Sequence, residues 1–128
     1  MTMKQTRNIH RAQRVGEMLQ QALGMYFIEG GSKDPRLENK NITVTYVRLS
    51  DDLKFAKVYI QVLGQTQVEK DVLEALNEDS YRIKRDIAHA LKLRYTPAMT
   101  FLEDVEFEKG QKLYQMIESL HKGEGQHD

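Results

Sequence analysis

The fold is decided by residues 42–63, ITVTYVRLSDDLKFAKVYIQVL. Two runs rich in β-branched and aromatic residues, 42–49 and 53–63, flank the short polar link SDD. Such runs are typical of β-strands, and a link this short joins antiparallel neighbours. In the second run, apolar residues at alternate positions predict one buried face. In the first run, the alternation slips near Tyr46 and Val47, which predicts a β-bulge.

The segment before the hairpin has the pattern of an amphipathic helix. From Arg7 to about Phe27, apolar residues recur at steps of three and four, so they share one helical face. Gly30 then ends the helix, and Pro35 resists its continuation. A loop is therefore expected between this helix and the first strand.

Two further helices are predicted after the hairpin. Thr66 and Glu69 have the spacing of a capping box, which predicts a helix from there to about Glu78. Residues 79–81, Asp-Ser-Tyr, carry side chains that prefer caps and turns, so the helix is interrupted there. A third helix starts near Arg82 and turns its apolar residues inward.

A third strand and a short helix complete the chain. Pro97 marks the entry to a strand from Met99 to about Phe107. Apolar residues at helical spacing follow at Leu113, Met116, Ile117 and Leu120. The expected class is α+β, with helices on one face of a three-stranded sheet. We expect one domain over residues 5–121 and a flexible tail over residues 122–128.

The composition excludes several classes of protein. The chain has 128 residues, 19 Lys and Arg, 19 Asp and Glu, and no Cys. A disulfide scaffold, a thiolate metal site and cysteine catalysis are therefore excluded, and a reducing compartment is favoured. The sequence has neither an apolar run of ~18 residues nor the apolar stretch of a secretory signal. We expect a soluble cytoplasmic protein.

Basic residues are concentrated in two blocks, residues 1–33 and residues 82–94. The candidate RNA-binding residues in them are Arg7, Arg11, Arg14, Arg82, Lys84, Arg85, His89, Lys92 and Arg94. On a helical wheel the first three form one stripe, and a second stripe holds Arg82, Arg85, His89 and Lys92. Closely spaced cations bind phosphates because they release counterions, although ordinary solvated helix faces have the same pattern.

Other polar groups give no catalytic or metal site. The acidic pairs Asp51-Asp52 and Glu103-Asp104 are interpreted as turn and strand-end residues, because turns favour adjacent acids. The four histidines, His10, His89, His121 and His127, lie on different elements without ligand spacing. We therefore predict no catalytic residue, no metal and no cofactor.

Three aromatic residues leave two alternatives open. Phe55 and Tyr59 share the outer face of the second strand, where they could stack on bases or be covered by the last helix. Tyr95, beside Arg94, could stack or pack, and packing is the favoured interpretation.

Three motifs resemble one protein family. They are Arg11-Ala12-Gln13-Arg14-Val15, Asp34-Pro35-Arg36-Leu37 and the hairpin from Val47 to Ile60, continued by LRYTPAMTF (residues 93–101) and Asp104. Their order and spacing over residues 7–117 resemble ribosome-binding factor A, a bacterial small-subunit assembly factor.

The resemblance implies a KH domain of the second topological type, with the order helix, strand, strand, helix, kink, helix, strand. In this family an Ala-x-Gly kink replaces the usual Gly-x-x-Gly loop, and here Asp79-Ser80-Tyr81 departs from it. The family binds the free small ribosomal subunit or its precursor near the decoding region and supports late processing of ribosomal RNA. The resemblance implies no catalysis and no cofactor, and we expect a monomer.

Two alternatives remain open. A protein-interaction adaptor would use the edge of the hairpin or the acidic carboxyl-terminal segment. A small hydrolase would need a nucleophile with a nearby base, and the sequence offers none. For the RNA-binding function, contacts to the RNA backbone should dominate over reading of bases, because neither a glycine-rich clamp nor an aromatic triplet is present.

Overall fold

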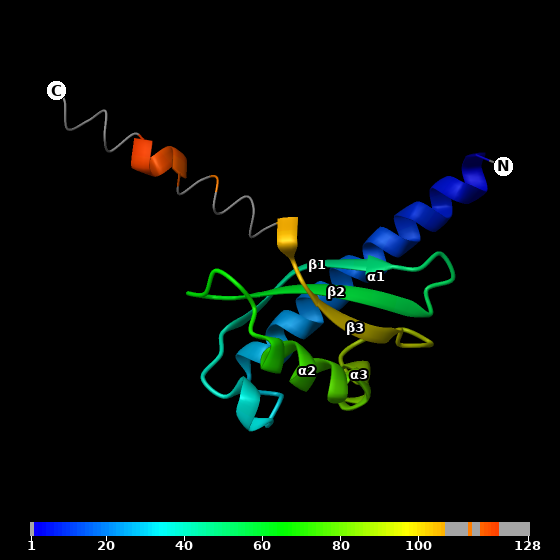
Figure 1. Ribbon diagram of the computed structural model, residues 1–128. Helices are drawn as coiled ribbons and strands as arrows, with labels where there is room; N and C mark the ends of the chain where they lie inside the picture. The colour runs from blue at the N-terminus through cyan, green and yellow to red at the C-terminus, as the bar shows by residue number, and fades with distance from the viewer. Residues whose placement is uncertain (1, 107–112, 114–115, 121–128) are drawn as a thin grey trace.

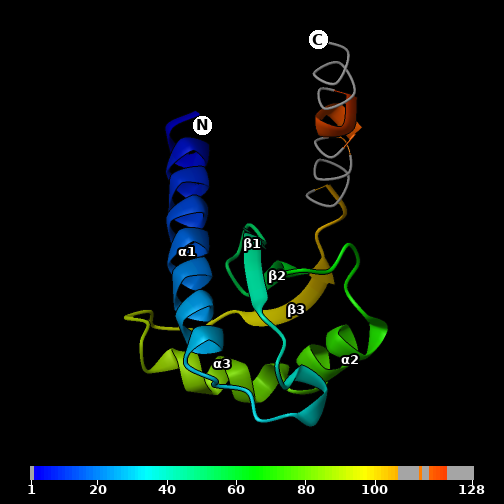
Figure 2. The same ribbon diagram turned by 90° about the vertical axis from the view of Figure 1, so that its left-hand side faces the viewer.

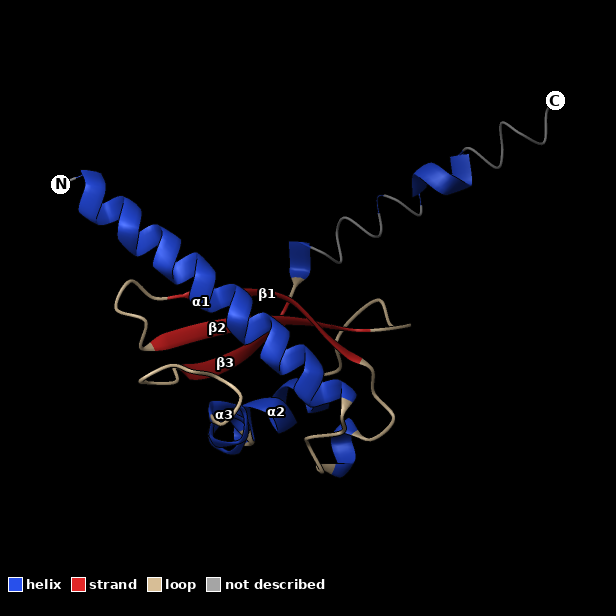
Figure 3. Ribbon diagram, turned by 180° about the vertical axis from the view of Figure 1, so that it is seen from behind, coloured by secondary structure: helices blue, strands red, loops and turns tan. Residues whose placement is uncertain are grey.

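Within the described residues, a layer of three helices packs on a sheet of three strands. The computed structural model describes residues 2–106, 113 and 116–120, with side chains from residue 10 onward. The elements are α1 (Thr2–Ile28), the 3-10 turn η1 (Pro35–Leu37), β1 (Ile42–Leu49), β2 (Phe55–Val62), α2 (Lys70–Glu78), α3 (Ser80–Ala88) and β3 (Ala98–Glu103). The helix α1 lies across one face of the sheet (Figure 3), and α2 and α3 pack against β3 beside it (Figure 2). The predicted α+β class is confirmed.

The sheet has the order β1-β2-β3 and contains the predicted bulge. The strands β1 and β2 are antiparallel, and their register shifts between Val44 and Tyr46, so Thr45 is the extra residue. The strand β3 runs parallel to β2, because α2 and α3 form the crossover between them. The Gln20 amide of α1 donates to the carbonyls of Val44 and Thr45 at 3.2 and 3.4 Å. The helix thus supplies a hydrogen-bond donor to the strand at the bulge.

The core lies between the helices and the inner face of the sheet. The residues predicted to point inward from the second strand and from the second and third helices are mostly buried. The most enclosed members of the core include Leu19, Leu23, Val58, Ile60, Val72, Leu76, Ile83 and Phe101. Burial of each large apolar side chain stabilises the fold by about 1.5–3 kcal/mol.

Several element boundaries differ from the predicted ones. The helix α1 begins at Thr2 rather than near Arg7, and β2 begins at Phe55 rather than at residue 53. The strand β3 ends at Glu103, short of the predicted end near residue 107, which lies outside the described residues. Local periodicity identifies an element but does not fix its ends, because terminal residues depend on caps and tertiary contacts.

The capping box predicted at Thr66 and Glu69 is wrong. The helix α2 begins only after Glu69, whose side chain makes no hydrogen bond to the helix amides. Its carboxylate instead accepts the Lys40 ammonium at 3.0 Å, and this bond lowers the pKa of Glu69. The amide of Val68 donates to the carboxylate of Glu103. Tertiary partners therefore occupy the groups that the local motif would have used.

The interruption predicted between the second and third helices is confirmed. Asp79 alone separates α2 from α3, with φ −93° and ψ 4°. Because this φ is negative, the break needs no glycine. The helix α3 restarts at Ser80 rather than near Arg82, and it ends at Ala88. The buried Leu91 therefore follows the helix and is not part of it.

The carboxyl end of α1 closes with the predicted glycine. Gly30 has φ +71°, and its amide donates to the Phe27 carbonyl at 3.2 Å. The amide of Gly31 donates to the Tyr26 carbonyl at 2.9 Å, which completes a Schellman cap. The Tyr26 hydroxyl then reaches the Gly31 carbonyl and the Asp86 carboxylate, both at 2.8 Å. The end of α1 is thereby fastened to α3.

The described residues of the predicted last helix do not cover the outer face of the sheet. The apolar ones among them, Leu113, Met116, Ile117 and Leu120, are exposed. Phe55 is 63% exposed, so the alternative in which this helix covers Phe55 and Tyr59 is wrong for the described residues. The tail over residues 122–128 lies outside them. In the described part of the chain, no helix is both long and apolar enough to cross a bilayer.

Candidate nucleic-acid interface

Three segments that are distant in sequence meet at one end of the molecule. They are the middle of α1, the turn between β1 and β2, and α3 with the segment that leads to β3 (left side of Figure 3). Together they enclose an open groove of about 1210 Å³. We call this depression the basic groove because of the residues that line it.

Five cations line the basic groove. They are Arg11 from α1, Lys54 from the β1–β2 turn, Lys84 and Arg85 from α3, and Arg94 from the segment before β3. None of the five forms an ion pair with any carboxylate of the described residues. Asp51 and Asp52 also line the groove, at the turn, without pairing with these cations. The positive charges are therefore available to an anionic ligand such as phosphate.

Two exposed tyrosines lie among these cations. The side chains of Tyr81 and Tyr95 are 73% and 75% exposed. The Arg94 guanidinium lies 5.5 Å from the Tyr95 ring centroid, within the range of a cation–π contact. Exposed rings beside cations are able to stack on unpaired bases. The favoured interpretation of Tyr95 as a packing residue is wrong, since its ring is mostly in solvent.

The β1–β2 turn is held in one conformation by its own hydrogen bonds. The Asp52 carboxylate accepts from the Ser50 hydroxyl at 2.7 Å and from the Lys54 amide at 3.1 Å, and these bonds lower the pKa of Asp52. Leu53 has φ +61°, which is rare for a residue with a Cβ. Such strain persists where surrounding contacts determine the conformation, and here the turn presents Leu53 and Lys54 to the groove. Asp52 is thus a turn residue, as predicted.

The other predicted acidic pair is also structural. The Glu103 carboxylate accepts the Val68 amide, and the Asp104 carboxylate accepts the Thr45 hydroxyl. Within the part of the chain that the structure describes, no group of three His, Asp or Glu side chains is placed to hold a metal ion.

The structure brings together four of the nine predicted RNA-binding residues. Those that line the basic groove are Arg11, Lys84, Arg85 and Arg94. Four others are exposed but do not line it: Arg14, Arg82, His89 and Lys92. The Arg7 side chain lies outside the described residues. The predicted helical stripe fails at its end, because α3 stops at Ala88 and leaves the last two residues of the stripe beyond the helix.

Sequence reasoning missed Tyr81 and Lys54. Tyr81 stands three and four residues before Lys84 and Arg85, so all three lie on one side of α3. This spacing is visible in the sequence, but the third helix was predicted to start near Arg82, so Tyr81 was not assigned to it. Lys54 had no local signal, because its position depends on the left-handed Leu53.

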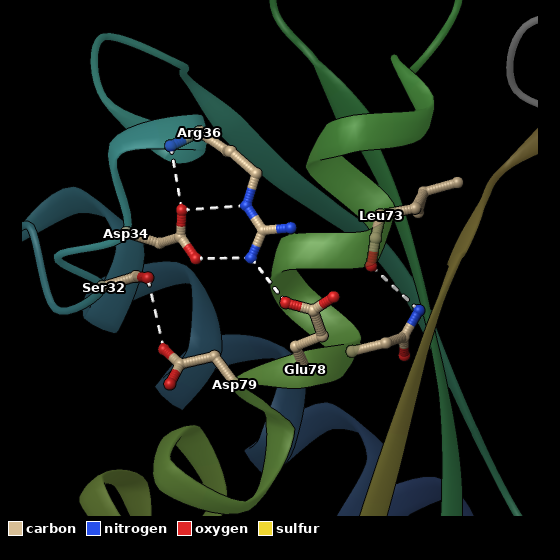
Figure 4. Close-up of polar contacts among 7 residues, drawn as sticks. Ser32, Asp34, Arg36, Leu73, Glu78 and Asp79 are labelled. Atoms are coloured by element: carbon tan, nitrogen blue, oxygen red, sulfur yellow. Dashed lines mark hydrogen bonds and ion pairs between the residues drawn. The ribbon is translucent and has the colours of Figure 1, made fainter.

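A polar clamp holds the loop after α1 against the junction of α2 and α3 (Figure 4). The Arg36 guanidinium donates to the Asp34 carboxylate at 3.1 and 2.8 Å and to the Glu78 carboxylate at 2.7 Å. The Ser32 hydroxyl donates to the Asp79 carboxylate at 3.4 Å. The bonds to Asp34 and Glu78 raise the pKa of Arg36, and the larger contribution comes from Asp34. The clamp fixes the point from which α3 carries its cations to the groove.

The Asp34–Arg36 pair should make stability depend on pH below about 4. The Arg36 bonds lower the pKa of Asp34 to about 2 from an ordinary value of 3.8. The pair therefore stabilises the fold above pH 3.8, and this contribution is lost as the pH falls through 2. We expect Asp34→Asn to be less stable than the wild type at pH 6 and to approach it near pH 2. Urea unfolding at both pH values measures this, and a difference that does not change with pH would contradict the assignment.

The comparisons with known proteins agree on one family. The family model of ribosome-binding factor A matches residues 11–117. The ribosome-binding factor A of Pelagibacter ubique is 39% identical over 112 residues, which cover 88% of this chain and 91% of the relative.

Solved structures with this architecture carry the same name. The crystal structure of ribosome-binding factor A from Thermus thermophilus has a TM-score of 0.58 at 28% identity and covers 72% of this chain and 94% of that one. A homology model of the Thermus thermophilus factor, fitted into a cryo-EM map of a complex with the 30S subunit, has a TM-score of 0.55 at 30% identity, covering 68% and 88%. The fold is the KH-like one that the motifs implied. The chain therefore belongs to the ribosome-binding factor A family.

Proposed function

We propose that this protein is a non-enzymatic assembly factor that binds the free or immature small ribosomal subunit through its ribosomal RNA. It acts as a monomer in the cytoplasm, as one KH-like domain over residues 5–121, and supports late maturation and processing of that RNA. Family membership supports the class of function, and one related structure was fitted into a complex with the 30S subunit.

The observation that carries the proposal is the convergence of cations in the basic groove. Arg11, Lys84, Arg85 and Arg94 come from two helices and a loop, and they meet without ion pairs to the described carboxylates. Guanidinium and ammonium groups in this arrangement hold several phosphates of one strand. Arg14, Arg82 and Lys92 are exposed outside the groove and extend the positive surface around it, and His89 is exposed as well. Arg7 is also proposed as an RNA-binding residue.

Binding alone is sufficient for an assembly function. A factor that binds one RNA conformation more tightly than another shifts the population toward the first. Phosphate contacts hold the protein on folded RNA, and Tyr81 and Tyr95 favour a conformation in which nearby bases are unstacked. No covalent step is required.

Co-sedimentation with purified small subunits tests the proposal. The full chain is expected to sediment with free small subunits at low salt and to be released as salt rises, with a log–log slope of ~0.7–0.9 per phosphate contact. Comigration that resists salt, or that follows one protein rather than the subunit, would favour the adaptor and contradict the proposal. Loss of comigration after removal of ribosomal proteins, with the RNA intact, would contradict it as well.

A further inference from the structure

The sheet has a second face that no described helix covers. In Figure 1 this face lies in front, and α1 passes behind it. We call it the open sheet face and define it by five outward residues: Tyr46 and Arg48 of β1, and Phe55, Lys57 and Tyr59 of β2. Tyr46 and Phe55 are 55% and 63% exposed. Exposed aromatic rings of this kind on a small protein mark a candidate interaction site.

The charges on this face are unbalanced. Arg48 lies directly opposite Lys57 in the β1–β2 register. Like charges at such positions destabilise a sheet. No outward-facing residue of the three strands is Asp or Glu, and neither cation forms an ion pair within the described residues. The chain has as many carboxylates as cations, so this arrangement is not a consequence of composition. The face is complementary to an anion.

Aromatic rings alternate with these cations. Phe55, Lys57 and Tyr59 follow one another at two-residue steps along β2, roughly 7 Å apart. The ring of Tyr46 lies 6.2 Å from that of Tyr59, with an interplanar angle of 35°. Rings that stack on bases and cations that bind phosphates are the two components of a surface for single-stranded nucleic acid. A duplex fits less well, because its bases are already stacked.

The open sheet face is continuous with the basic groove. Lys54 lines the groove, and Phe55, the next residue, is the first residue of the face. An RNA strand held in the groove is thus able to continue around the β1–β2 turn. The Asp104 carboxylate accepts the Thr45 hydroxyl in the middle of β1, beside Tyr46, so one negative charge borders the face away from Phe55 and Lys57.

We propose that the open sheet face is a second RNA-binding surface, for a short stretch of unpaired nucleotides. Phe55 and Tyr59 stack on bases, and Arg48 and Lys57 hold the phosphates between them. This surface goes beyond the proposed function, for which the basic groove is sufficient. It also adds base stacking to an interface that the sequence predicts to act mainly through the RNA backbone.

Crosslinking of the full chain tests the proposal. The probe is a twelve-nucleotide oligouridylate that contains 4-thiouridine, and crosslinks are mapped by mass spectrometry. We expect crosslinks within residues 55–59. Phe55→Ala should weaken binding of the same oligonucleotide at least fivefold, since stacking of one base on a ring contributes at least this factor. Arg48→Gln with Lys57→Gln should reduce the salt slope by ~1.4, or ~0.7 for each phosphate contact.

Matched variants separate this surface from the basic groove. Lys33→Gln with Lys70→Gln makes the same change in charge at exposed sites away from the face, and it should leave affinity unchanged. A groove variant with Lys84→Glu, Arg85→Glu and Arg94→Glu should keep the crosslinks in residues 55–59 even if it no longer binds small subunits. Wild-type crosslinks that avoid these residues would overturn the proposal, whether or not the variants fold. Unchanged affinity in folded face variants would also overturn it, and this is the result expected if the face binds a protein.

Discussion

The triple variant Lys84→Glu, Arg85→Glu, Arg94→Glu is expected to bind the small ribosomal subunit about 100-fold more weakly than the wild type in ~0.1 M salt. All three side chains line the basic groove and lack carboxylate partners in the described part of the protein. Each phosphate contact contributes a salt slope of ~0.7–0.9, so three lost contacts account for roughly two to three powers of ten at this ionic strength. The salt slope should fall by about 2. Titration of labelled protein into purified subunits at several salt concentrations measures both quantities.

A second triple variant controls for the general loss of positive charge. Arg14→Glu, Arg82→Glu and Lys92→Glu make the same change in net charge at exposed residues that do not line the groove. We expect the affinity of this variant to fall by less than tenfold, compared with about 100-fold for the groove variant. Equal losses would mean that the overall field, not the groove, attracts the subunit. A larger loss in the second variant would place the RNA along the outer helical stripe.

The sequence was sufficient to predict the hairpin and its packing. The order of neighbouring residues shows the alternation that places Val58 and Ile60 in the core. It also shows the break in alternation that corresponds to the bulge at Thr45. Alternation is a strong signal because neighbouring strand residues point to opposite faces. The end of α1 before Gly30 was predictable for a similar reason, since the Schellman cap uses residues adjacent in sequence.

The starts of α2 and α3 could not be predicted in this way, whereas the predicted end of α2 near Glu78 is confirmed. The capping box at Thr66 failed because Lys40, from the loop before β1, takes the carboxylate of Glu69. The start of α3 at Ser80 depends on a junction that Ser32 contacts from another part of the chain. These partners are distant in sequence, so the residues around each helix start do not indicate them.

The candidate site was predictable only in part for the same reason. A helical wheel identifies residues that face solvent, and Arg82 and Lys92 are indeed exposed. It does not say which exposed residues of different elements meet. Arg11 and Arg94 come together because α1 and the segment before β3 lie at one end of the sheet.

Gly31→Ala is expected to destabilise the protein by about 2–3 kcal/mol. A Cβ at this position would lie 2.5 Å from two atoms of the Tyr26 ring, closer than van der Waals contact allows. The ring cannot move freely, because its hydroxyl reaches the Gly31 carbonyl and the Asp86 carboxylate at 2.8 Å. Displacement therefore adds the loss of a hydrogen bond to a charged group, about 1.5–3 kcal/mol, to the strain of overpacking. Alanine also lowers the conformational entropy of the unfolded chain, which offsets only about 0.4–1 kcal/mol of this destabilisation. Urea denaturation measures the difference.

Gly24→Ala is the matched control for this substitution. Gly24 lies inside α1, and a Cβ there would meet no heavy atom within 4 Å. The general preference for alanine over glycine in a helix should then increase stability by about 0.5–1 kcal/mol. If Gly31→Ala lowers the free energy of unfolding and Gly24→Ala raises it, the effect at Gly31 is due to the Tyr26 ring. If both variants change the free energy of unfolding in the same direction, the ring is excluded as the cause. Because Tyr26 joins α1 to α3 through Asp86, the Gly31→Ala variant should also bind small subunits more weakly, while Gly24→Ala should bind them normally.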